Sequence, residues 1–403
     1  MPSSLIDVIR QHVPTAASLT MAARVEQPRG LLAALARVPD PRDRRGIRYS
    51  LASLLAVAVC AVLAGAVTFA AIMDWADDLD PAAGRRLGFT GRVPVLSTLW
   101  RLLIRVDAAT LQAVLTDWLR SHLPVPQPTV RPHWRIIAID GKVQRGARLP
   151  DGRQVHQLPA YDTTDGVVLA QVQIPAKSNE IPAFTPLLEQ VVARLGSLNN
   201  VVFVADALHA QVAHAREVAR LGGNLYVAVK ANQPTLFAQL KQLPWAQVPV
   251  GDHRRDRGHG RRETRTVKAL TVCTPGGIAF PHAEQAVRIT RTRIVGDQRT
   301  HEMAYLVVSL PADQAPPADP QDWACSEWHI ENRLHWIRDE TFRENAHQAR
   351  TGNGPAVAAV LRNTAIGFHR SNGEPNIARA TRRANRRPHD LIDAVTRNYP
   401  TTQ

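Results

Sequence analysis

Three observations predict an α/β fold with a mixed sheet that follows a helical N-terminal region. Residues 134–174 contain three short apolar segments of strand character, and the turn sequence TTDG separates the last two. Residues 181–230 then alternate amphipathic, helix-like segments with the apolar segments VVFVA and LYVAVK. Residues 245–312 form a second strand-rich stretch. Early strands followed by alternating helices and strands are typical of a mixed sheet that helices cover.

Residues 1–125 precede this pattern and are predicted to be helical. Within them, residues 51–73 (LASLLAVAVCAVLAGAVTFAAIM) carry no charge and are numerous enough to span a bilayer. The run is rich in alanine and contains Ser53, Gly65 and Thr68. This composition favours a buried helical hairpin or a long core helix, with a membrane span as the alternative.

A proline-rich segment marks a domain boundary. The sequence LPVPQPTVRP, residues 123–132, contains four prolines and predicts a linker. It divides a helical domain, residues 1–125, from an α/β domain, residues 126–370. The polar, arginine-rich residues 371–403 are predicted to form a basic C-terminal tail.

The charge of the chain indicates a polyanionic partner. Lys and Arg total 49 and Asp and Glu total 35, which gives a net charge of +14 over 403 residues. A protein with 45% hydrophobic residues has enough apolar material for a core, so this excess charge points to nucleic acid. Ordinary surface charge that keeps the protein in solution is the alternative, although clustering of the arginines counts against it.

The cysteine content fits a reducing compartment. The sequence has three cysteines, Cys60, Cys273 and Cys325, and no pair has the spacing of zinc ligands. Such a set predicts neither a disulfide framework nor a zinc site. The N-terminus lacks the basic and apolar regions of a secretory signal, so we expect a cytoplasmic protein.

Two acids stand at the ends of predicted strands. Asp140 ends the segment WRIIAID, and Asp206 follows VVFVA. If the two strands are neighbours, both carboxylates lie at one edge of the sheet, where their mutual repulsion calls for a cation. Mg²⁺ commonly binds one or two carboxylates together with phosphate oxygens and water. A third acid, Glu331, shares a predicted helix face with Trp328 and His335.

Each of these acids also has a simpler interpretation. Asp140 precedes Gly141 and fits a turn, whereas Asp206 fits the cap of a following helix. Glu331 fits a solvated helix position. Together, in a basic chain, the three acids favour a site over three unrelated roles.

Six motifs in order resemble a known family. They are AIDGKVQRGA, KSNEIPAFTPLLEQV, FVADALHAQ, YVAVKANQP, HGRRETRT and WHIENRLHW. The sequence resembles the DDE transposases of bacterial insertion sequences, in the branch that includes the H-repeat-associated proteins. The resemblance extends from about residue 30 to about residue 390, with a helical N-terminal region that matches residues 38–65.

The resemblance implies a fold, an activity and a set of site residues. The fold is a ribonuclease-H-like mixed sheet with a strand-rich insertion, here residues 245–312, ahead of the last acid. Asp140, Asp206 and Glu331 would be the catalytic residues and the ligands of two Mg²⁺ ions, with Mn²⁺ as an alternative. The enzyme would cleave the ends of its element and transfer the 3′-hydroxyl strand to target DNA.

The resemblance also implies partners. These are double-stranded DNA, namely the terminal inverted repeats and the target, and a second copy of the chain in a homodimer. We expect the helical N-terminal domain to bind the element ends. No membrane partner is expected.

The sequence departs from related enzymes around Glu331. Where they place Tyr, Arg and Lys, this chain has Ala324, Glu327 and Arg338, and only Arg338 keeps a positive charge. Two other functions therefore remain open, an inactive DNA-binding relic of a transposase and a nuclease without strand transfer.

Basic residues near the acids and in one cluster are expected to contact DNA. Residues 253–262 are dense in arginine and histidine and predict a DNA-facing loop, with a solvated charged segment as the alternative. His209 and Gln211 are expected either to orient a nucleotide or water or to lie on a helix surface, and Trp328 and Trp336 to pack in the core. The predicted DNA-binding residues are Lys142, Arg145, Lys177, Lys230, Arg254, Arg255, Arg257, Arg261, Arg262 and Arg338.

Overall fold

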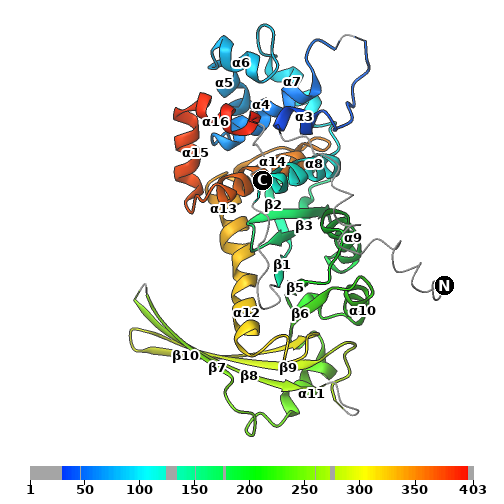
Figure 1. Cartoon of the computed structure of the whole chain (residues 1–403), viewed down its shortest axis with the longest axis vertical. Helices are drawn as coiled ribbons and strands as arrows, with labels where there is room; N and C mark the ends of the chain where they lie inside the picture. The colour runs from blue at the N-terminus through cyan, green and yellow to red at the C-terminus, as the bar shows by residue number, and fades with distance from the viewer. Residues whose placement is uncertain are drawn as a thin grey trace, which may run out of the picture.

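The structure is a computed structural model that describes residues 30–45, 47–123, 134–149, 151–175, 178–258, 260–272 and 277–397. The molecule is elongated, with helices at one end, strands in the middle and a flat antiparallel sheet at the other end (Figure 1). Lys177 of the predicted DNA-binding set lies outside the described residues.

Helices form the N-terminal end over the described residues 30–45 and 47–123, as predicted; residues 1–29 and most of the predicted linker lie outside the described residues. The apolar residues 51–73 contribute two of these helices, α4 and α5, which pack against each other. The turn between them ends at Thr68, whose hydroxyl accepts a hydrogen bond from the backbone N–H of Ala71 at 3.1 Å. In the described ranges, no helix has both the length and the apolar character that crossing a membrane requires. The helices are α3 (Leu31–Leu35), α4 (Leu51–Leu63), α5 (Phe69–Asp77), α6 (Pro81–Arg86), α7 (Leu96–Leu103) and α8 (Ala108–Ser121).

The C-terminal residues fold back onto this helical end. Helix α14 (Gly354–Ser371) packs on α4 and α8, and α15 (Ile377–Arg386) and α16 (Pro388–Thr396) pack on α4, α6 and α3. The stretch expected to be a basic tail thus contributes two helices, because apolar residues between its arginines reach the core. Those buried residues are Ile377, Ala380, Leu391, Ile392 and Val395.

One sheet of ten strands forms the middle and the far end. Its order is β2-β3-β1-β5-β6-β10-β9-β8-β7, with β4 paired to the other side of β3. Strands β1, β5 and β6 are mutually parallel. On either side of these three, β3 pairs antiparallel with β1 and β10 pairs antiparallel with β6. The predicted mixed sheet is confirmed. The strands are β1 (Arg135–Ile139), β2 (Lys142–Arg148), β3 (Gln154–Asp162), β4 (Val167–Gln173), β5 (Val201–Ala205), β6 (Asn224–Val229), β7 (Asp252–Gly258), β8 (Arg261–Thr271), β9 (Gln285–Val295) and β10 (Gln298–Val308).

Short helices connect the parallel strands. A 3₁₀ turn, η1 (Ile181–Ala183), leads into α9 (Phe184–Leu195) before β5, and η2 (Ala207–His209) leads into α10 (Val212–Arg220) before β6. Helix α11 (Pro234–Gln242) then packs against β10. This order matches the alternation of helix and strand that the sequence predicts.

The strands β7 to β10 form the antiparallel part of this sheet at the far end of the molecule, called the far sheet below, and the β7–β8 and β9–β10 hairpin ends project to one side (Figure 1). The predicted loop conformation of residues 253–262 is wrong: residues 253–258 belong to β7 and residues 261–262 to β8, paired in register from Asp252 with Val267 to Gly258 with Arg261. The strand was missed because its side chains are charged and exposed, so no apolar alternation marks it. Contact of these residues with DNA stays a prediction.

A long helical segment crosses from this sheet to the N-terminal end. Helix α12 (Ala318–Ile330) lies over β1 and β5, with Trp323 in a core cluster with Val267 and Ile289. It continues through a π-helical turn, η3 (Glu331–His335), into α13 (Trp336–Glu340) and the 3₁₀ turn η4 (Glu344–Ala346). The third predicted acid, Glu331, begins the π-helical turn.

Candidate active site

Asp140 and Asp206 leave the sheet side by side. In the parallel pair of β1 and β5, Ile139 lies opposite Ala205, and the two acids are the next residues. Neighbouring strands are about 4.8 Å apart, so the backbones of the two acids leave the sheet about one strand spacing from each other. Both side chains are half-buried. The prediction that the two strands are neighbours and carry their acids to one edge is confirmed in this register.

Asp206 also caps the turn that follows it. Its Oδ1 accepts a hydrogen bond from the backbone N–H of Leu208 at 2.9 Å, at the start of η2. The interpretation as a cap and the interpretation as a strand-end acid therefore both apply. The cap uses one carboxylate oxygen and fixes the direction of the side chain at the end of β5.

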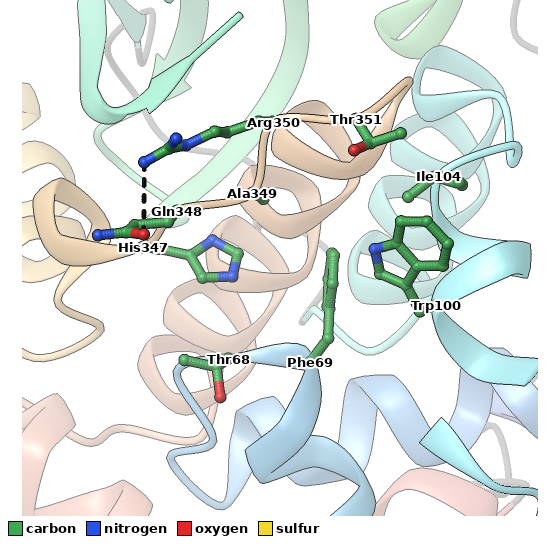
Figure 2. A pocket seen from close by; sticks show the side chains of 9 residues that line it. All are labelled: Thr68, Phe69, Trp100, Ile104, His347, Gln348, Ala349, Arg350 and Thr351. Atoms are coloured by element: carbon green, nitrogen blue, oxygen red, sulfur yellow. Dashed lines mark hydrogen bonds between the residues drawn. The ribbon is translucent and has the colours of Figure 1, made fainter. Parts of the chain in front are cut away.

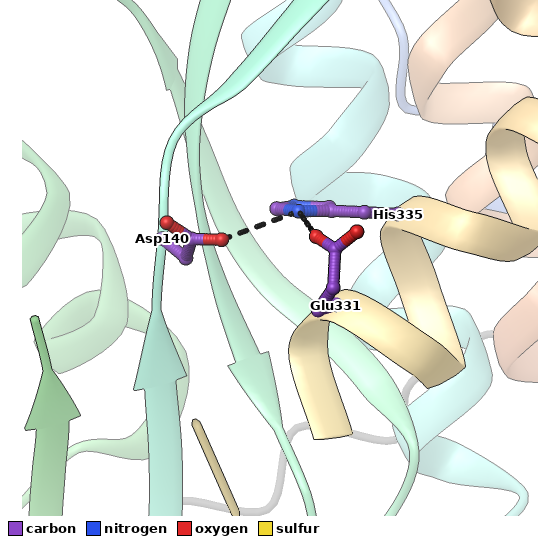
Figure 3. A group of neighbouring side chains, drawn as sticks. All are labelled: Asp140, Glu331 and His335. Atoms are coloured by element: carbon purple, nitrogen blue, oxygen red, sulfur yellow. Dashed lines mark hydrogen bonds and ion pairs between the residues drawn. The ribbon is translucent and has the colours of Figure 1, made fainter. Parts of the chain in front are cut away.

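Glu331 and His335 face Asp140 from the π-helical turn (Figure 3). His335 Nδ1 lies 3.4 Å from Asp140 Oδ2 and 3.3 Å from Glu331 Oε2. The hydrogen bond from His335 holds the pKa of the Glu331 carboxyl below its usual value. π-Helical turns within α-helices are frequent at functional sites, and this one brings an acid and an imidazole to one point.

These three side chains have the chemistry of a metal site. One ligand atom from each of Asp140, Glu331 and His335 lies within 4.8 Å of the others. Carboxylate oxygens suit Mg²⁺ and Mn²⁺, and an imidazole nitrogen adds a softer donor. His335 is buried, and its Nε2 has no hydrogen-bond partner among the described side chains and backbone. Asp206 lies beside this cluster and is not part of it.

A further carboxylate, Glu327, stands one helical turn before Glu331. Burial raises the pKa of Glu327, the negative charges of Asp206 and Asp140 raise it further, and Lys230 opposes them. Glu327 thus adds to an already crowded group of acids. The sequence showed Glu327 only as a departure from related enzymes.

The predicted basic residues near the acids have different surroundings. Lys142 is buried on β2 and its Nζ forms an ion pair with Asp339, so its charge is neutralised inside the protein. Arg145 on β2 and Lys230 after β6 are exposed. Of these three, the exposed Arg145 and Lys230 are free to approach a phosphate.

Arg338 does not lie where a DNA contact requires it. Its side chain is fully buried, and its guanidinium binds Glu344 and the side-chain oxygens of Gln157 and Gln171. A buried charge that is already paired gains nothing from moving toward a phosphate. The residue that keeps the positive charge of related enzymes here stabilises the scaffold beneath the acids.

The two tryptophans beside the acid are exposed, and their predicted core packing is wrong. Trp328 is 43% exposed and Trp336 is 56% exposed. Trp328 packs under two arginines of the far sheet, with the Arg291 Cζ 4.6 Å and the Arg265 Cζ 5.6 Å from its ring centre. Cation–π contacts therefore join the helix that carries Glu331 to β8 and β9.

The arginines of β7 and β8 divide between the two faces of their sheet. Residues paired in register share a face, and successive residues alternate. Arg254 and Arg261 lie on the face that α12 covers, together with Val267. The opposite face carries three of the five predicted arginines, which are Arg255, Arg257 and Arg262.

A separate hollow lies between the N-terminal helices and the segment after η4 (Figure 2). Its volume is about 500 Å³, and Phe69, Trp100 and His347 line it together with Arg350 and Gln348, whose side chains are 3.3 Å apart. None of the predicted site residues that the structure describes lines this hollow.

An acidic group that could hold a metal ion, at the strand ends of a mixed sheet in a strongly basic chain, is the kind of site that enzymes acting on nucleic acid use. Comparison with known proteins gives the family. Residues 32–119 match the region described as DDE_Tnp_1-associated, and residues 132–368 match the transposase DDE domain. The chain belongs to the DDE transposase family.

Individual relatives agree with this family. The chain is similar to YncI of Escherichia coli O157:H7, named as a candidate transposase, with 26% identity over 84% of this chain and 87% of that protein. It is also similar to the H repeat-associated protein YhhI of Escherichia coli strain K12, with 25% identity over 82% of this chain and 87% of that protein. The resemblance to the H-repeat-associated branch is confirmed.

Among solved structures, the chain is similar to a piggyBac transposase in a synaptic complex with hairpin DNA. The sequence identity is 10%, the TM-score is 0.42, and the match covers 93% of this chain and 80% of that one. A likeness at this level supports no inference about this protein.

Proposed function

We propose that this protein is the transposase of an insertion sequence, which cleaves the ends of its element and joins the freed strands to target DNA. The observation that carries the proposal is the adjacency of Asp140 and Asp206 at the ends of two parallel strands, with Glu331 facing Asp140 through His335. Family membership supports the same reaction.

Asp140, Asp206 and Glu331 would hold two Mg²⁺ ions, or Mn²⁺ in their place. The ions would supply the positive charge that stabilises the transition state of phosphodiester cleavage. Asp140 offers the central carboxylate because it lies next to Asp206 in the sheet and across from Glu331. His335 would orient both acids or add its Nδ1 to the ligand set.

Two substitutions at phosphorus account for the reaction. In the first, a water oxygen bonds to phosphorus and the bond to the 3′ oxygen breaks, which leaves a 3′-hydroxyl and a 5′-phosphate. In the second, that 3′-hydroxyl attacks a target phosphodiester, and a target 3′ oxygen leaves. Neither step consumes a nucleotide or forms a covalent bond to the protein.

The arrangement of strands supports a ribonuclease-H-like core. The strands β1, β5 and β6 are parallel, β3 pairs antiparallel with β1, and β4 pairs antiparallel with β3. The last acid follows the helix that packs over β1 and β5. In this proposal β7 to β10 are the insertion and the N-terminal helices bind the element ends. Two ends must be held together, so we propose a homodimer.

Cleavage of labelled DNA that carries the element ends, with Mg²⁺, tests the function. We expect Asp140→Asn and Asp206→Asn each to lower the cleavage rate by about 10²-fold or more, because each variant loses a carboxylate that would hold the divalent ions, whose positive charge stabilises the transition state. DNA affinity should change little. Asp313→Asn, an exposed acid before α12, is the matched control and should cleave normally.

Three outcomes separate the alternatives. Normal cleavage by either site variant would remove Asp140 or Asp206 from the catalytic set. Binding without cleavage by the wild type identifies a DNA-binding relic, which the unusual Glu327 favours. Cleavage without joining to a second labelled duplex identifies a nuclease.

A further inference from the structure

A half-buried acid, Glu180, joins two histidines beneath the strand-end acids. Its Oε1 lies 3.3 Å from His156 Nε2 on β3, and its Oε2 lies 3.4 Å from His209 Nε2 in η2. His156 is on the strand antiparallel to β1, and His209 follows Asp206 by three residues. The Glu180 carboxylate thus connects β3, the neighbour of the strand that ends at Asp140, to η2, the turn that follows Asp206.

The same carboxylate lies against the residue after Asp140. A Cβ placed on Gly141 would stand 2.0 Å from Glu180 Oε1 and 2.7 Å from His156 Nε2. Non-bonded contacts of a Cβ under 3.0 Å are essentially never seen in proteins, so only glycine lets the carboxylate approach this closely. Glu180 therefore closes over the backbone between β1 and β2, immediately beside Asp140.

His209, one of the two histidines of this bridge, is tightly packed. His209 is fully buried, its ring centre 5.0 Å from that of Phe184. His214 stacks on Phe184, with ring centres 4.0 Å apart, and lies 5.3 Å from the His209 ring; its Nε2 is 3.1 Å from the backbone oxygen of Ile181. Packed aromatic rings leave His209 little freedom, so its hydrogen bond holds Glu180 in place.

Electrostatics agrees with a persistent bridge. Burial raises the pKa of Glu180, but its interactions with His156 and His209 outweigh this effect and lower the pKa to about 2. The carboxylate is therefore ionised at neutral pH and can accept a hydrogen bond from an N–H on the Nε2 of either ring. None of these residues belongs to the metal cluster of Asp140, Glu331 and His335.

We propose that Glu180 is a positioning residue that fixes the separation of the Asp140 and Asp206 carboxylates. It acts through Gly141 on one side and through His209 and η2 on the other. The proposal rests on the proposed function only in its use of these two acids as metal ligands. Partners that orient ligands commonly change metal affinity by about 10- to 100-fold when they are replaced.

Direct metal binding, measured without DNA, tests the role. Mn²⁺ titration followed by electron paramagnetic resonance gives the dissociation constant for the wild type and for Glu180→Gln, which keeps the volume but cannot accept from both rings. We expect Glu180→Gln to bind Mn²⁺ about 10-fold more weakly with unchanged DNA affinity. Glu189→Gln, an exposed acid of α9, is the matched control.

A second pair of variants protects the test from misfolding. Gly141→Ala should weaken Mn²⁺ binding because its Cβ displaces the Glu180 carboxylate, and the same change in a Glu180→Ala background should cost less. A well-folded Glu180→Gln protein with wild-type Mn²⁺ affinity, or fully additive effects of the two changes, would overturn the proposal. If the wild type binds Mn²⁺ but cleaves no DNA, the proposed function fails. The positioning role of Glu180 is then still decided by the Mn²⁺ affinities of the variants.

Discussion

Arg338 and Glu344 form a bidentate ion pair in which both side chains are fully buried. Arg338 Nε lies 2.9 Å from Glu344 Oε2, and Arg338 Nη2 lies 2.9 Å from Glu344 Oε1. Arg362 of α14 adds a third bond to Oε1 at 3.0 Å. Through Glu344, Arg338 of α13 and Arg362 of α14 are joined, so the helix after the Asp140, Glu331 and His335 cluster is tied to the helix that packs on the N-terminal region.

Removal of the central acid should destabilise the fold strongly. Glu344→Gln leaves two buried guanidinium groups without a counter-charge, so we expect the free energy of unfolding to fall by about 3–5 kcal/mol. Denaturant unfolding measures this loss. Arg299→Met, a change at an exposed position, should stay within about 0.5 kcal/mol of wild type. A loss below about 1 kcal/mol for Glu344→Gln would contradict the structural role.

The same acid predicts a pH dependence of stability. Burial raises the pKa of Glu344, but Arg338 and Arg362 outweigh it and lower the pKa from 4.5 to about 2. A lowered folded-state pKa stabilises the protein above pH 4.5, and the contribution disappears as the pH falls from 4.5 toward 2. Its size is about 3 kcal/mol by linkage. The difference in unfolding free energy between wild type and Glu344→Gln should therefore shrink between pH 6 and pH 3, and a constant difference would contradict the shift.

Much of the sheet follows from local patterns, and its polar strands do not. The apolar strands β1, β5 and β6 and the hairpin of β3 and β4 have the alternation and turn residues that sequence reasoning uses. The strand β2 (KVQRGAR) and the strand β7 (DHRRDRG) are polar, so pairing with a neighbour, and not their own pattern, makes them strands.

The acids were predictable, whereas their surroundings depend on tertiary contacts. The positions of Asp140 and Asp206 follow from strand ends, which a single sequence reveals. The bridge of Glu180 with His156 and His209 joins segments that are far apart in the chain, so no residue spacing in the sequence predicts it. The same holds for burial, since the sequence does not distinguish the buried Arg338 from an exposed arginine.

His335 should contribute directly to metal affinity. Its Nδ1 lies 3.4 Å from Asp140 and 3.3 Å from Glu331, so its removal takes away either a ligand or the group that orients both acids. We expect His335→Ala to weaken Mn²⁺ binding by about 10-fold or more, measured by titration without DNA. His301→Ala, an exposed histidine of β10, is the control. Equal affinity for wild type and His335→Ala would exclude His335 from the site.

DNA binding should depend steeply on salt because the net charge is +14. Each phosphate contact by Lys or Arg releases counterions, so six or more contacts would lower affinity by about 10³-fold between roughly 50 and 200 mM salt. Fluorescence anisotropy with a labelled duplex across this range measures the slope. An affinity that stays constant over the range would show that the charge serves another purpose.

One face of the far sheet carries unneutralised positive charge. Two of its registered rows are Arg255, Thr264, Thr292, His301 and Arg257, Arg262, Ile294, Arg299. These rows contain no acid. On the opposite face, Glu263 pairs with Arg265 and Arg291, and Asp322 of α12 pairs with Arg254.

We therefore expect the open face to bind the DNA backbone and the opposite face to act mainly in packing. Replacement of Arg255, Arg257 and Arg262 by Ala should reduce the salt slope of DNA binding by about one unit for each phosphate that the variant no longer neutralises. Replacement of Arg254, Arg265 and Arg291 by Ala removes the same charge and is the matched control. Because these three are already paired with acids, their removal should lower stability and leave the slope nearly unchanged. Equal slopes for the two triple variants would mean that net charge, and not the arrangement of arginines on the sheet, determines binding.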